Sequence, residues 1–234
     1  MLFTNPHKGV YLATAMSLLL LVGCGSTPKT PDETIGDLQQ SPEGAEGGPQ
    51  FSFDLSGPEQ NPYLTQEVSV PGPAQALFND GVRAMQAQQW SRAIILLQQL
   101  NREYPNLSGP YLNLGIAYRQ LQQMDAAEQA FAQAVTVNAM NMDALNQLAL
   151  LKREKGDFKA AETFYLEALS VWPRHAPSHK NIGILYDLYM GEFAKALDHF
   201  EVYQYLQAEP DRRIAGWIID LQRRIENLQA GAQP

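Results

Sequence analysis

A 34-residue period in the second half of the chain limits its fold more than any other feature. Two of the three spacings between its equivalent alanines are 34 residues and the third is 35, which places one extra residue near Tyr189-Met190-Gly191. Apolar residues also recur at helical spacing within each period. Such a period predicts an all-α solenoid of stacked helix pairs with a shared core. The equivalent residues are Gly81, Gly115, Ala149 and Gly183; Ala93, Ala127, Ala161 and Ala196; and Leu97, Phe131, Tyr165 and Phe200.

The third copy resembles the tetratricopeptide repeat (TPR) most clearly, through Ala149, Ala161, Tyr165, Ala168, Pro173 and the turn Gly156-Asp157-Phe158. The resemblance implies helix-turn-helix repeats at residues 74–107, 108–141, 142–175 and 176–209. Small residues in this pattern let the helices approach closely, and the aromatic residue fills the space between them. One repeat cannot bury its apolar face alone, so the last repeat needs a cap.

Residues 210–234 are expected to form that capping helix and a tail, because Pro210 is followed by an apolar stripe at helical spacing over residues 211–228. The helix also carries two basic pairs eleven residues apart, which is close to three helical turns. These residues form either a basic patch for anionic lipid, peptidoglycan or an acidic partner, or simply a solvated helix face. The four are Arg212, Arg213, Arg223 and Arg224.

The TPR resemblance also implies a binding groove lined by the first helix of each repeat. The residues at its usual lining positions are mostly apolar, with three cations among them, which suits an amphipathic helix or an extended apolar peptide bearing some acidic groups. Alternatively, the aliphatic residues are partly buried between the repeats. The expected groove residues are Phe78, Val82, Met85, Leu112, Ile116, Arg119, Leu150, Arg153, Lys180 and Ile184.

The first 23 residues have the features of a secretory signal peptide. Lys8 precedes an apolar run over residues 10–22, which is too short to span a bilayer comfortably. The run ends at Leu21-Val22-Gly23-Cys24, which resembles a bacterial lipobox and contains the only cysteine of the chain. That resemblance implies cleavage after Gly23, acyl chains on Cys24 and, because Gly25 follows, the periplasmic face of the outer membrane.

Residues 24–73 are expected to be a disordered tether. They hold eight of the 15 prolines, eight carboxylates and a single basic residue, Lys29, so most of the net charge of −8 lies here. Sequence of this kind cannot bury enough apolar surface to offset the entropy of ordering. Phe51, Phe53 and Leu55 alternate with small or polar residues. They are either isolated apolar residues in a linker or an arm that docks on a partner or on the domain itself.

The sequence does not predict an enzyme, a cofactor or a small-molecule substrate. It has no glycine-rich phosphate loop and no Gly-x-Ser-x-Gly nucleophile. His175 and His179 are four residues apart, but Pro177 separates them, and zinc requires further ligands. The slightly acidic repeats argue against nucleic acid as a partner.

Together these features indicate a membrane-anchored periplasmic scaffold whose groove binds a periplasmic or membrane protein in an envelope assembly. One alternative is a factor similar to the pilotin lipoproteins of type IV pili, which escort a secretin and are also built of TPRs. A second is an adaptor of a TonB/ExbB/ExbD-type transducer. A third, a peptidoglycan hydrolase, lacks a visible catalytic constellation.

Overall fold

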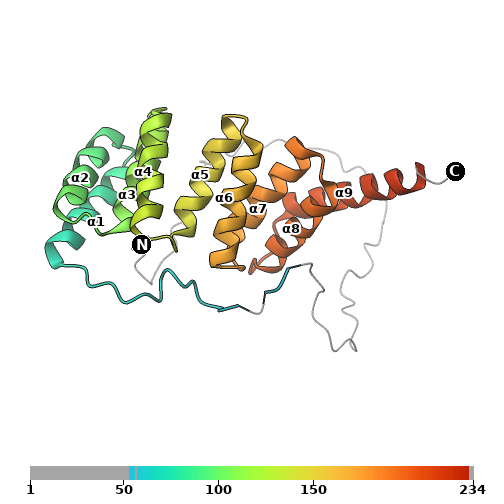
Figure 1. Cartoon of the computed structure of the whole chain (residues 1–234), viewed down its shortest axis with the longest axis horizontal. Coiled ribbons are helices and arrows are strands. Elements are labelled where there is room, and N and C mark those ends of the chain that lie inside the picture. The colour runs from blue at the N-terminus through green and yellow to red at the C-terminus, as the bar shows by residue number, and fades with distance from the viewer. Residues whose placement is uncertain (1–52, 56, 232–234) are drawn as a thin grey trace, which may run out of the picture. The chain divides into compact units, whose positions relative to one another are not determined.

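The computed structural model describes residues 53–55 and 57–231, and Figure 1 shows a row of helices that follow one another in chain order. Each helix packs on the next along the chain, and no strand forms within the described ranges. Every expected repeat contains one antiparallel pair, and the last pair is followed by a single long helix. The elements are α1 (Gly72–Gln86), α2 (Trp90–Glu103), α3 (Ser108–Gln120), α4 (Met124–Val137), α5 (Met142–Glu154), α6 (Phe158–Val171), α7 (Ala176–Leu185), the π-helix η1 (Tyr186–Met190), α8 (Phe193–Tyr205) and α9 (Arg212–Gly231). The architecture is a TPR-type solenoid, as the period predicts.

The turn within each repeat reverses the chain through one residue with positive φ. These residues are Gln88 (56°), Gln122 (61°), Gly156 (79°) and Gly191 (69°), so glutamine occupies the left-handed region in the first two repeats. Side-chain caps begin two of the helices in the third repeat: Asn141 Oδ1 accepts from the Ala144 amide and Asp157 Oδ1 from the Ala160 amide. The repeated turn keeps each pair in the same geometry.

The inserted residue of the fourth repeat is accommodated by η1, a single π-helical turn at the end of α7. A π-turn holds one more residue than the α-helical turn that it replaces, so the register before and after it is preserved. The turn leaves two side chains in solvent, with Leu188 66% and Tyr189 47% exposed. The ring of Tyr189 lies 5.0 Å from that of Phe158, at the start of α6.

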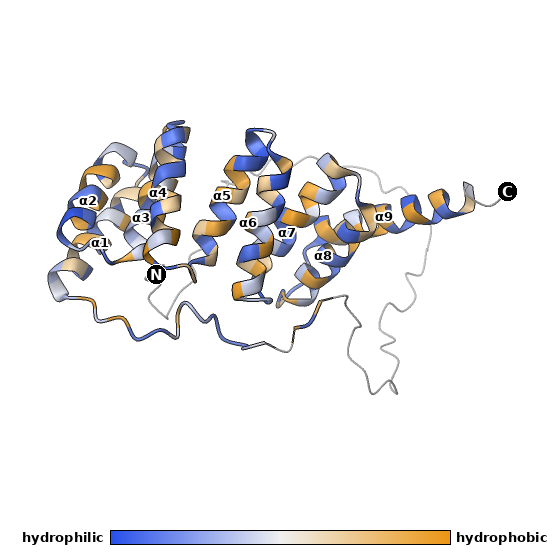
Figure 2. Ribbon diagram, in the orientation of Figure 1, coloured by the Kyte–Doolittle hydropathy of each residue, from blue (hydrophilic) through white to orange (hydrophobic). Residues whose placement is uncertain are grey.

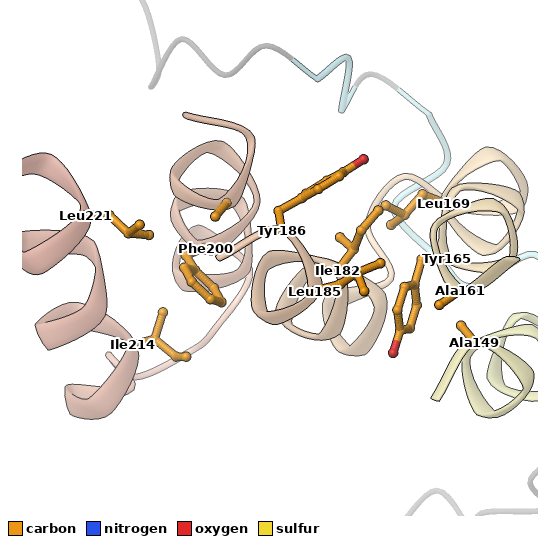
Figure 3. Close-up of a cluster of buried hydrophobic side chains, with 11 residues drawn as sticks. Ala149, Ala161, Tyr165, Leu169, Ile182, Leu185, Tyr186, Phe200, Ile214 and Leu221 are labelled. Carbon is orange, nitrogen blue, oxygen red and sulfur yellow. The ribbon is translucent and has the colours of Figure 1, made fainter. Parts of the chain in front are cut away.

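The core lies between successive helices and is built from the periodic residues. Figure 3 shows how the ring of Tyr165 lies beside Ala149 and Ala161, while Phe200 fills the same role towards α9. In α9, Ile214 and Leu221 are buried, and Trp217 and Ile218 pack partly against the same cluster. In Figure 2 apolar and polar residues alternate along each helix, as expected of helices that bury one face. Small residues such as Ala149 and Ala161 leave room for the ring of Tyr165, so that neighbouring helices can approach closely.

The residues before α1 pack against the repeats, contrary to the disordered tether expected through residue 73. We call residues 53–55 and 57–70 the strap. In Figure 1 the strap runs along one edge of the helix row, from α1 back to α8. Tyr63, only 6% exposed, packs with Met142, Leu145 and Ala168. The physical reason for the difference is that a few aromatic anchors order this segment despite its polar, proline-rich composition.

The other features expected of the N-terminal region lie outside the described residues. They are the signal peptide at residues 1–23, Cys24, residues 25–52 of the tether and Phe51. Of the helices in the described ranges, none is both long and apolar enough to cross a membrane.

Candidate functional site: one face of the repeats and the strap edge

The expected groove residues divide into a buried pair and a half-buried row. Phe78 and Leu112 are each 1% exposed and belong to the core, so the expectation that they contact a partner is corrected. They are buried because the fifth position of these repeats faces the neighbouring helices. The half-buried aliphatic residues are Val82 and Met85 on α1, Ile116 on α3, Leu150 on α5 and Ile184 on α7. Of these, Val82, Met85, Ile116 and Ile184 also pack against the core, so the row is both part of the packing and part of the surface.

Polar contacts join the first helices of successive repeats across this same face. Arg119 on α3 forms an ion pair with Glu154 on α5. The Arg153 guanidinium on α5 donates to the Asn181 carbonyl on α7 at 3.3 Å. These bonds bring the predicted groove residues of neighbouring repeats together.

The third predicted cation, Lys180 on α7, is tied to the loop before α9. Its Nζ lies 3.1 Å from Asp211 Oδ2. Burial disfavours its charge, but the hydrogen bonds to Asp211 and Tyr203 outweigh that effect and raise the pKa of Lys180. The cations expected to meet acidic groups of a partner therefore already contact a neighbouring repeat or the loop before α9, and the aliphatic row remains as the half-buried apolar part of this face.

The basic patch is also divided. Arg212, Arg213 and Arg223 are exposed, whereas Arg224 is half-buried. Arg224 forms ion pairs with Asp187 and with Asp220, and its guanidinium carbon lies 4.4 Å from the centroid of the Phe193 ring. Arg224 is thus a structural residue that fixes α9 to the fourth repeat.

The strap occupies the edge formed by the turns between repeats and the helix ends beside them. The Trp172 indole Nε1 donates to the Pro58 carbonyl at 2.9 Å. Farther along, Asn138 Nδ2 donates to Gln66 Oε1 at 2.7 Å. Where the strap passes the turn between α2 and α3, a pocket of about 190 Å³ remains, lined by Tyr63, Gln66, Val68, Asn106, Leu107, Ser108, Gly109, Val137 and Asn138. Docking of the arm that contains Phe53 on the domain was one alternative from the sequence, but the contacts of Tyr63 and Gln66 at this edge were not predicted.

A pair of buried histidines lies beneath the N-terminal end of the strap. His179 Nδ1 and His199 Nδ1 are 2.9 Å apart, and His179 Nε2 lies 2.8 Å from the Pro173 carbonyl. Because a carbonyl only accepts, His179 carries its proton on Nε2, and His199 Nδ1 donates to His179 Nδ1. The ring of Phe53 covers both, at centroid distances of 5.4 Å and 4.3 Å. Burial lowers the pKa of both histidines, that of His179 to about 4.

The rings of His175 and His179 have separate hydrogen-bond partners. The ring of His175 bonds to Ser178 and Asp143, while that of His179 bonds to His199 and Pro173. Over residues 53–55 and 57–231, no cluster of three or more histidine, cysteine, aspartate or glutamate side chains is placed to hold a metal ion.

The comparison with solved structures gives the same architecture at low sequence identity. MamA matches with 23% identity over 58% of this chain and 79% of its own, at a TM-score of 0.52. PilF from Pseudomonas aeruginosa matches with 19% identity over 66% of this chain and 69% of its own, at a TM-score of 0.59. MamA from Desulfovibrio magneticus RS-1 matches with 16% identity over 70% of this chain and 92% of its own, at a TM-score of 0.57. At these identities the likeness shows the fold alone.

Family models give a more direct result, although no curated protein sequence matches the chain. Three models described as the tetratricopeptide repeat match residues 75–107, 109–139 and 141–203. Together they cover more than half of the chain and all four helix pairs of the structure. The chain therefore belongs to the tetratricopeptide repeat family.

Proposed function

We propose that this protein is a lipid-anchored scaffold of the bacterial envelope, which binds a helix or an extended peptide of a protein partner along its first helices. The observation that carries the proposal is the row of half-buried aliphatic residues Val82, Ile116, Leu150 and Ile184 at one position of four successive repeats. TPR proteins are typically interaction scaffolds, and a regular apolar row on rigid helices suits a partner with apolar side chains at regular spacing.

The membrane location in the proposal is based on the sequence around Cys24. Cleavage after Gly23 and acylation of Cys24 would hold the protein at the periplasmic face of the outer membrane. A single acyl chain gives marginal binding, whereas several chains on one cysteine give a stable anchor. A partner in the same membrane then meets the repeats at high effective concentration, so modest affinity suffices.

The binding test compares two double variants after crosslinking in cells. Ile116→Glu with Leu150→Glu places two charges in the aliphatic row. The matched control is Ile95→Glu with Leu166→Glu, which places two charges at aliphatic residues of the second helices that are 63% and 42% exposed. We expect the first pair to lose the main crosslinked partner and the second to keep it, with unchanged helix content in both. A partner retained by both would refute the role of the row.

The anchor is tested separately by metabolic acyl labelling of the wild type and of Cys24→Ser. Label is expected on the wild type alone, and the Cys24→Ser protein is expected in the soluble periplasmic fraction with its repeats folded. Full cellular function of that soluble form would contradict the need for an anchor.

A second candidate is a pilotin-like role in type IV pilus secretin biogenesis, and the fold likeness to PilF is the observation that favours it. A third is an adaptor of a TonB/ExbB/ExbD-type transducer. The crosslinking experiment separates these candidates, because the captured partner is a secretin subunit in one case and a transducer component in the other.

A further inference from the structure

The strap determines where the chain that precedes it enters the fold. Phe53 packs on His179 of α7 and His199 of α8, and Gly57 lies against Pro173 between α6 and α7. Helix α8 in turn packs on α9. The described chain therefore begins beside the last repeat, although α1 belongs to the first.

This route shortens the connection between Cys24 and the repeats. Only 29 residue steps separate Cys24 from Phe53, against 50 from Cys24 to Ala74. Fully extended, the shorter segment reaches about 100 Å and the longer about 170 Å. A flexible chain of the shorter length has a typical span of roughly 30 Å, which equals the length of a 20-residue helix such as α9. An anchor at Cys24 thus favours orientations with α9 near the membrane.

Three exposed cations of α9 have no internal partners among the described residues. Arg212, Arg213 and Arg223 are exposed, and none forms an ion pair with a described carboxylate. Most other cations in the described part are paired, among them Arg119, Lys180 and, on α9 itself, Arg224.

An exposed apolar residue lies on the same face as two of these cations. Ile219 is 49% exposed and stands seven residues after Arg212 and four before Arg223, which places the three side chains along one stripe of the helix, with Ile219 and Arg223 as neighbours. Binding of a helix to a lipid surface increases with the apolar area it buries and with the attraction of its basic residues to anionic lipids, so Ile219 and the arginines beside it can both contribute.

We propose that this face of α9 docks on the anionic lipid surface of the membrane that holds Cys24. The proposal rests on the proposed anchor and assigns it an orientation, with the last repeat towards the lipid. Each arginine near such a surface gives roughly a fivefold gain in partitioning, about 1 kcal/mol. Binding by three arginines is weak for a free protein and sufficient for a tethered one.

The first test uses the chain from Cys24 onwards, without acylation, and vesicles of phosphatidylcholine with or without phosphatidylglycerol. We expect partitioning onto the phosphatidylglycerol vesicles that weakens with salt and falls on the order of 100-fold in Arg212→Gln/Arg213→Gln/Arg223→Gln. The matched control, Arg83→Gln/Arg92→Gln/Arg102→Gln, makes the same charge change in the first repeat and should bind like the wild type. Equal binding by the two triple variants, or no preference for the anionic vesicles, would overturn the proposal.

The second test asks whether the strap sets the orientation. The thiol of Cys24 allows coupling to a maleimide lipid, and hydrogen exchange then reports protection of α9 on anionic vesicles. Phe53→Ser with Tyr63→Ser should reduce that protection in the coupled protein. Unchanged protection would refute the orientation by the strap. Absence of the acyl label from the wild-type protein in cells would instead refute the anchor. The crosslinking result for the variant with Ile116→Glu and Leu150→Glu concerns partner binding and is independent of both lipid tests.

Discussion

The imidazole rings of His179 and His199 meet nitrogen to nitrogen, 2.9 Å apart, inside the fourth repeat. Both rings are nearly inaccessible, at 1% and 2% exposure, and both are neutral because burial lowers their pKa. An unfolded histidine has a pKa of about 6.5, so below that pH the unfolded chain takes up protons that the folded protein resists.

We expect the pair to reduce stability as the pH falls from about 6.5 towards 4. Proton uptake by His179 in the unfolded chain lowers the free energy of unfolding by at most about 3 kcal/mol, at 1.36 kcal/mol per pH unit. Urea unfolding at a series of pH values measures this. His179→Leu/His199→Phe should flatten the dependence in that range, while the carboxylates, which also titrate there, remain the same in both proteins. Parallel curves would contradict the assignment.

Tyr63 and Leu64 are neighbours in the strap with opposite environments, the first 6% and the second 50% exposed. Tyr63→Ala should cost about 3 kcal/mol of unfolding free energy, since it empties a site among Met142, Leu145 and Ala168. Leu64→Ala should cost under about 0.5 kcal/mol. If thermal or urea unfolding shows equal small losses, the strap does not contribute to the folded state.

Gly183 is a glycine because of the ring beside it. A methyl group there would lie 2.6 Å from Cε1 of Phe200, whereas nothing lies within 4 Å of a methyl group at Gly216 in α9. We expect Gly183→Ala to destabilise the protein by about 1–2 kcal/mol despite the better helix propensity of alanine. Gly216→Ala should stabilise it by up to about 1 kcal/mol. Chemical denaturation of the two variants in parallel provides the comparison, and the same sign for both would show that the ring is not the constraint.

Arg223 and Arg224 are adjacent, yet only Arg224 contacts a carboxylate. Asp187, whose side chain is 10% exposed, would lose its cation in Arg224→Ala. The change should therefore cost about 2 kcal/mol and speed hydrogen exchange in α9. Arg223→Ala should alter stability by less than about 0.5 kcal/mol. Adding Asp187→Asn to Arg224→Ala should recover part of the loss, and no recovery would exclude an unpaired buried carboxylate as the cause.

The repeats could be read from the sequence because their packing is local and periodic. Ala161, Tyr165 and their equivalents recur in every copy, and the alanine spacing even indicated the extra residue that became η1. The ion pair between Arg119 and Glu154 could not be predicted, since it joins residues from different repeats whose side-chain directions depend on the stacking. Phe78 and Leu112 were misassigned because the family's exposed fifth position is occupied here by residues that turn into the core.

The strap was anticipated only in part: docking on the domain was one of the alternatives left open for Phe51, Phe53 and Leu55, and Phe53 does pack on it. Its anchors, Phe53 and Tyr63, are ten residues apart in sequence, and each packs on two helices that are distant from it along the chain. Composition alone indicated disorder, which is the average property of the segment. The packing depends on two residues that the average conceals.

In an ordinary solenoid each repeat contacts only its neighbours, so the end repeats can fray one at a time. The strap adds a long-range connection, because it begins on α7 and α8 and continues directly into α1. Opening the fourth repeat must release Phe53, and loss of the strap in turn uncovers the packing of Tyr63 on α5 and α6. The strap therefore couples repeats that do not touch, and the molecule should unfold as a single cooperative unit instead of unzipping from its ends.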